Sequence, residues 1–81
     1  MTTDSKPTAS DWVRLLAEEL GTAPPTDDEI SDLLAIAGVA AHAAERTAAP
    51  LTTWLFGRAG VPPAEARETA ARIASRLDSS G

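Results

Sequence analysis

The sequence predicts an all-α protein, a small four-helix bundle with short Pro- and Gly-containing connections. Three observations lead to this fold class. Apolar residues recur at helical spacing in four stretches, proline or glycine separates these stretches, and no stretch alternates apolar and polar residues as a strand does. The 81 residues include no cysteine, so disulfides and thiolate metal sites are excluded and the helices must form the core unaided.

A single helical domain is expected over residues 10–77. Residues 1–9 are polar and are interpreted as a disordered leader, and residues 78–81 as a disordered tail. A chain of this length buries only about 60% of the surface that its unfolded form exposes. We therefore expect a small core of modest stability.

The first helix is expected from Asp11 to Leu20. Ser10 or Asp11 can cap its free amides, and Gly21 follows where a left-handed C-terminal residue is favoured. Its apolar stripe has the spacing i, i+3, i+4, i+8 and consists of Trp12, Leu15, Leu16 and Leu20.

The second helix is expected to run from a capping box, with Thr26 as the cap and Glu29 reaching back to it, to about Arg46. Its apolar stripe begins with bulky residues and continues with small ones, so that another helix can approach closely beyond Leu34. The stripe consists of Ile30, Leu33, Leu34, Ala37, Ala41 and Ala44.

Pro50 is expected at the first position of a third helix that ends at Gly60. This helix is apolar over more than half of its circumference, which predicts a central, buried helix with its aromatic residues in the core. Phe56 points to one side of its main face. That face consists of Leu51, Trp54, Leu55 and Ala59.

The fourth helix is expected to begin at Pro63 and to lie at the periphery, packed along a single seam. Its narrow stripe consists of Ala66, Ala70, Ile73 and Leu77.

The net charge of −5 is unevenly distributed. Residues 1–34 carry eight acids against two basic residues, whereas residues 35–81 carry four acids against five arginines. The acidic half repels phosphate, which argues against nucleic acids and anionic membranes as partners. The apolar runs are far shorter than the roughly 18 residues of a membrane span, so the expected location is the cytoplasm.

Four residues near the junction of the second and third helices are candidates for function: His42, Arg46, Thr52 and Thr53. His42 and Arg46 are four positions apart, and the amino end of the third helix favours anions. The alternative interpretation is that both cations simply complement the C-terminal end of the second helix. A lone histidine without cysteine cannot form an ordinary zinc site, so no metal is expected.

Catalysis is not expected from this sequence. It contains no nucleophile elbow, no paired-histidine zinc motif and no phosphate-binding loop. No catalytic residue and no cofactor are therefore predicted.

Several stretches together resemble a small actinobacterial helical domain family of unknown function, found alone or appended to molybdenum-cofactor guanylyltransferase-like proteins. The excess of arginine over lysine, six to one, is compatible with such a source. The resemblance implies an accessory connection to molybdenum-cofactor maturation and transfers no role to any residue. It rests on Trp12 to Gly21, Asp32 to Ala37, Ala41-His42 through Arg46, Ala49 to Thr53, and Leu55 to Gly57.

Three functions follow as expectations. The first is a non-enzymatic module that binds another protein, such as a molybdenum-cofactor nucleotidyltransferase or a molybdoenzyme, through the region around His42, Arg46 and Thr53. The second is a small-molecule module in which His42, Arg46 and Thr52 hold an anionic nucleotide or a pterin phosphate. The third is a structural homodimer.

Overall fold

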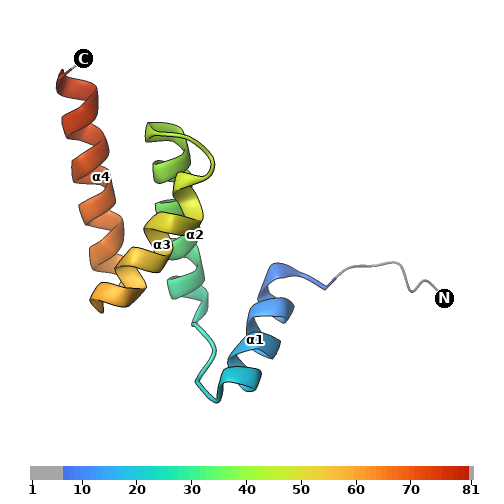
Figure 1. The fold of residues 1–81 in the computed structure, drawn as a ribbon. Helices are drawn as coiled ribbons and strands as arrows, with labels where there is room; N and C mark the ends of the chain where they lie inside the picture. Colours follow the sequence, from blue (N-terminus) through green and yellow to red (C-terminus); the bar gives the residue numbers. More distant parts are fainter. Residues whose placement is uncertain (1–6, 81) are drawn as a thin grey trace.

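Four helices and no strand make up the part of the chain that the structure, a computed structural model, describes (Figure 1). It describes the backbone of residues 7–80 and the side chains of residues 7–78; residues 1–6 and 81, which belong to the predicted leader and tail, lie outside this range. The all-α fold class is confirmed. The helices are α1 (Ala9–Leu20), α2 (Asp27–Ala43), α3 (Ala48–Ala59) and α4 (Pro63–Ser80).

Helix α2 is the centre of the arrangement. It packs against α4 and against α3, and these three helices form what we call the three-helix unit. Helix α1 lies to one side of this unit at the end of an extended connector (Figure 1). The bundle is therefore three packed helices with a fourth standing apart.

The core of the three-helix unit is a close contact between α2 and α4. Ile36 of α2 has no exposed surface, and it clusters with Ala66 and Ala70 of α4, which are 1% and 7% exposed. Because the two alanines have so little side-chain height, the helices approach closely enough to enclose the isoleucine. Four half-buried apolar residues surround this contact: Leu33, Val39, Phe56 and Val61.

An ion pair crosses the same two helices. Arg67 Nη1 of α4 lies 3.0 Å from Asp32 Oδ1 of α2, with the arginine half exposed. An exposed pair of this kind adds about 1 kcal/mol at most. It helps to set how α4 aligns along α2.

The predicted helix-end signals are largely confirmed. At α2, the Glu29 amide donates to Thr26 Oγ1 (3.1 Å) and the Thr26 amide donates to Glu29 Oε1 (2.8 Å), which completes the capping box. Gly21 and Gly60 end α1 and α3 with φ angles of 71° and 73°. The predicted cap of α1 was wrong: the helix begins earlier, and the Asp11 amide donates to Thr8 Oγ1 at 3.0 Å.

Three other helix bounds differ from the prediction. Helix α2 ends at Ala43 because Ala44 leaves the helical region, so Arg46 lies in a turn. Helix α3 begins at Ala48, which makes Pro50 its third residue; the first four amides of a helix have no partner, so the proline is tolerated there. Helix α4 continues through residues 78–80, since no proline or glycine interrupts it.

The predicted burial of the third helix was also wrong. No residue of α3 is buried, and Leu51, Trp54 and Leu55 are 57–64% exposed. Phe56, on the side of the helix, is the residue that packs onto the core. Helix α3 packs against α2 through the side that carries Phe56, and its broad face has no neighbour among the described residues.

The buried face of α2 differs from the predicted stripe for a related reason. Ile36 lies about 120° round the helix from the middle of that stripe, at 100° per residue. Leu34, which belongs to the stripe, is 65% exposed. Because α1 does not cover it, Leu34 faces solvent, whereas Leu33 of the same stripe packs against the core.

The seam between α2 and α4 can be tested by core substitution. Ile36→Val should lower the free energy of unfolding by about 0.5–1.5 kcal/mol, because it leaves a methyl-sized gap in an enclosed site. Leu34→Ala should change it by less than about 0.5 kcal/mol, because that leucine is exposed. Urea denaturation monitored by circular dichroism measures both values. Equal effects of the two substitutions would contradict the burial described above.

Two glycines, one inside α3 and one directly after it, provide a test of backbone conformation. Gly60→Ala should destabilise the protein by about 1–2 kcal/mol, because alanine is strained at a φ of 73°. Gly57→Ala should stabilise it by about 0.5–1 kcal/mol, because this glycine is inside the helix and a Cβ there meets no atom within 4 Å. Effects of the same sign in thermal melts would refute the assigned end of α3.

Candidate functional site

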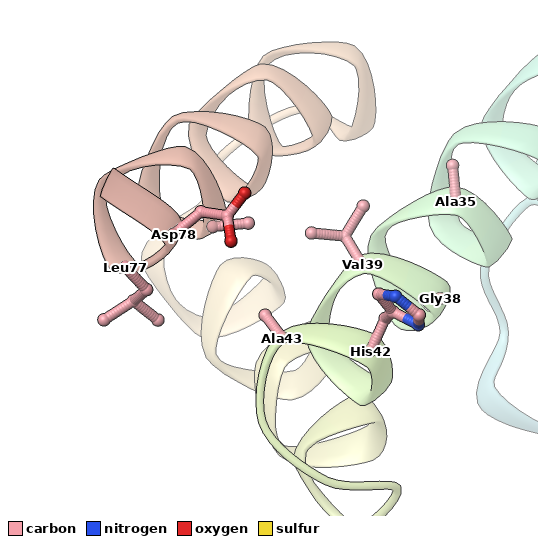
Figure 2. Close-up of a pocket in the computed structure, with 8 residues that line it drawn as sticks. Ala35, Gly38, Val39, His42, Ala43, Leu77 and Asp78 are labelled. Carbon is pink, nitrogen blue, oxygen red and sulfur yellow. The ribbon is translucent and has the colours of Figure 1, made fainter. Parts of the chain in front are cut away.

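A groove of about 760 Å³ opens between the C-terminal halves of α2 and α4 (Figure 2). We call it the α2–α4 groove. From α2, Val39 and Ala43 reach toward the space between the helices, and Asp78 of α4 reaches toward it from the other side (Figure 2). The residues lining it are Ala35, Gly38, Val39, His42, Ala43, Ala74, Leu77 and Asp78.

The small size of the facing residues explains why the groove is open. Where Ile36 fills the space against Ala66 and Ala70, the seam is closed. Beyond Ile36 the lining includes the small residues Gly38, Ala43 and Ala74, and the space between the two helices stays open. A Cβ placed on Gly38 meets no atom within 4 Å.

A second, smaller and mostly apolar pocket continues the groove toward α3. It shares Val39, Ala43, Ala74 and Leu77 with the groove and adds Thr52 and Phe56 of α3. The two hollows therefore form one continuous surface between the three helices. This surface is apolar at the α3 side and polar at the mouth, where His42 and Asp78 lie.

His42 is the predicted site residue that lines the groove. Its side chain is exposed and has no hydrogen bond or ion pair with any described residue. No Ser or Thr hydroxyl among the described residues is bonded to it.

Arg46 does not join His42 in the groove. Because α2 ends at Ala43, the four-residue spacing no longer places the two side chains on one helix face. Arg46 is exposed in the turn and lines neither the groove nor the second pocket. Its carbonyl accepts a hydrogen bond from the Ala49 amide (3.1 Å), which gives it a role in the turn.

The two threonines occupy different environments. Thr52 is half-buried and lines the second pocket. Thr53 Oγ1 donates to the Pro50 carbonyl at 3.0 Å and lies 3.3 Å from the Ala49 carbonyl, so its hydroxyl is already bonded within α3. The four predicted residues are thus near one junction without sharing one cavity.

Asp78 is a groove residue that the sequence analysis missed. It was assigned to the tail, whereas α4 continues through it and brings its carboxylate opposite α2. A carboxylate that lines the groove disfavours an anionic ligand and favours a cationic group. Within the described residues, no three His, Asp or Glu side chains gather as metal ligands.

Two exposed apolar stripes lie outside the groove. The stripe on α1 is formed by Trp12, Leu15, Leu16 and Leu20, which are 44–69% exposed. The stripe on α3 is formed by Leu51, Trp54 and Leu55, with the Arg58 guanidinium 5.1 Å from the centre of a Trp54 ring. Exposed aromatic and arginine side chains are typical of protein-binding surfaces.

One comparison with known proteins identifies a relationship. A family model described as "Domain of unknown function (DUF6457)" matches residues 4–80, a range that contains all four helices. No curated protein and no solved structure matches the chain. This match confirms the predicted resemblance to a small domain family of unknown function. No helix in the described residues has both the length and the apolar character to cross a membrane.

The exposure of the two candidate cations leads to a stability prediction. His42→Ala and Arg46→Ala should each change the free energy of unfolding by less than about 0.5 kcal/mol, since neither side chain has a described partner. Urea denaturation measures the change. A loss comparable to that of a core substitution would show that these side chains are structural.

Proposed function

The chain belongs to the DUF6457 family, a domain of unknown function, and we propose that it is a non-enzymatic accessory module that binds another protein. The observation that carries this proposal is the open α2–α4 groove with its apolar continuation toward α3. Grooves of this kind between helices receive an amphipathic helix through its apolar face.

The chemistry of the groove specifies the occupant. The alanine and valine walls, together with the exposed Leu77, suit two or three apolar side chains of a partner helix. Asp78 at the mouth suits a lysine or arginine on the same helix, and His42 provides a further polar contact. A helix with a basic edge and a narrow apolar face fits this description.

The proposed identity of the partner rests on the sequence resemblance to a domain family appended to molybdenum-cofactor guanylyltransferase-like proteins. That resemblance supports a molybdenum-cofactor nucleotidyltransferase or a molybdoenzyme, in an actinobacterial cytoplasm. Two residues of the stretches that carry the resemblance line these hollows: His42 lines the groove and Thr52 lines the second pocket.

An NMR titration tests this proposal. The labelled full chain is titrated with a molybdenum-cofactor nucleotidyltransferase and, separately, with a molybdoenzyme from the same organism. Amide shifts should cluster at Gly38, Val39, His42 and Ala74 for one of the two proteins. Ala74→Glu should abolish them, because it fills the groove and places a second carboxylate beside Asp78.

Ala71→Glu is the matched control. It adds the same charge to an exposed position of α4 that lines neither hollow, so binding should be retained. If neither protein shifts the groove amides, or if the shifts cluster elsewhere, the proposal fails.

No observation favours the small-molecule alternative. Arg46 lies outside the groove, the Thr53 hydroxyl is bonded within its own helix, and Asp78 opposes an anion. Phosphate, GMP and GTP should therefore leave the melting temperature unchanged. Stabilisation by any of them that Arg46→Ala removes would restore that alternative.

A further inference from the structure

Helix α1 exposes an apolar stripe that the described chain does not cover. Of its residues only Ala17 is buried, while Trp12, Leu15, Leu16 and Leu20 face solvent. A helix of 12 residues is marginal in water without tertiary contacts. The stripe therefore needs a surface that buries it.

The stripe on α3 is a matching surface. Leu51, Trp54 and Leu55 follow the same helical spacing, and they are exposed to a similar degree. Each stripe offers one tryptophan beside leucines on a single face of a 12-residue helix. The α3 stripe, over residues 51–55, is shorter than the α1 stripe, over residues 12–20, but both have the same chemistry, so the α3 stripe can pack along part of α1.

The charges beside the two stripes are complementary. Glu19 lies within about 20° of Trp12 on the α1 face, at 100° per residue, and Arg58 lies on the α3 face over Trp54. The whole chain has the same polarity, with its acids concentrated before residue 35 and its arginines after it. Packing α1 onto α3 brings opposite charges together.

The connector keeps α1 away from α3 of the same chain. Residues 21–26 include Pro24 and Pro25, whose fixed φ angles stiffen the link. Val13 of α1 lines a small pocket together with these prolines and Ile30. This contact covers one side of α1 and leaves the apolar stripe exposed. Helix α1 projects outward as a result (Figure 1).

We infer that two copies of this chain form a symmetric dimer in which the α1 stripe of each packs on the α3 stripe of the other. Such an exchange makes the same contact twice around a two-fold axis. With roughly 100 Å² exposed on each leucine and 150 Å² on each tryptophan, complete burial of both stripes in the two contacts would remove about 1,600 Å² from water, the area of a standard stable interface. The α2–α4 groove stays outside this contact, so the inference is independent of the proposed function.

Sedimentation equilibrium of the full chain over a wide concentration range is the test. The wild-type chain should sediment as a dimer of 8.4 kDa subunits. Leu16→Glu and Leu55→Lys should each raise the dimer dissociation constant at least about tenfold, because each variant places a charge in both contacts. Circular dichroism should show that any loss of helical content is no larger than the 12 residues of α1, because the three-helix unit does not depend on the dimer contact.

Mixing the two variants distinguishes exchange between chains from closure within one. In the mixed dimer, Glu at position 16 meets Lys at position 55 in one contact and the other contact is native, so association should return. Leu34→Glu, at an exposed leucine outside both stripes, is the control and should remain dimeric. A monomeric wild type, an unaffected single variant or a mixture that stays monomeric would overturn the inference.

Discussion

The packing of Ile36 against Ala66 and Ala70 is the contact on which the rest of the structure depends. It brings α4 close to α2, and the half-buried Phe56 attaches α3 to the same cluster. The groove adjoins the same seam: Ala66 and Ala70 enclose Ile36, whereas Gly38, Ala43 and Ala74 line an open space further along. The core and the candidate site therefore lie next to each other along the contact between α2 and α4.

The parts of the fold that could be predicted are those decided by neighbours in the sequence. The Thr26 and Glu29 capping box, the left-handed Gly60 and the start at Pro63 each depend on a few adjacent residues, and all are present. Which face a helix buries depends on distant partners. Trp54 and Phe56 show the difference. The helical periodicity predicts that Trp54 lies in the core, but α2 packs against the side of α3 that carries Phe56.

The candidate site was predicted in part for the same reason. His42 lines the groove, because α2 extends far enough to carry it. Arg46 does not line the groove, because α2 ends three residues before it. The position of Arg46 relative to His42 is therefore set by a turn, and helical spacing does not predict it. Asp78 carries no local signal of function; only the straight continuation of α4 brings its carboxylate into the groove opposite α2.

The position of α1 has a consequence for how this protein responds to its own abundance. Its stripe has little cover in the described chain and a 12-residue helix is marginal by itself, so the dimer inferred above would stabilise α1. The three-helix unit is held by contacts within the chain and keeps its structure at any dilution. The order of α1 would then follow concentration through mass action, and amide exchange in this helix would report how much of the protein is bound to another molecule.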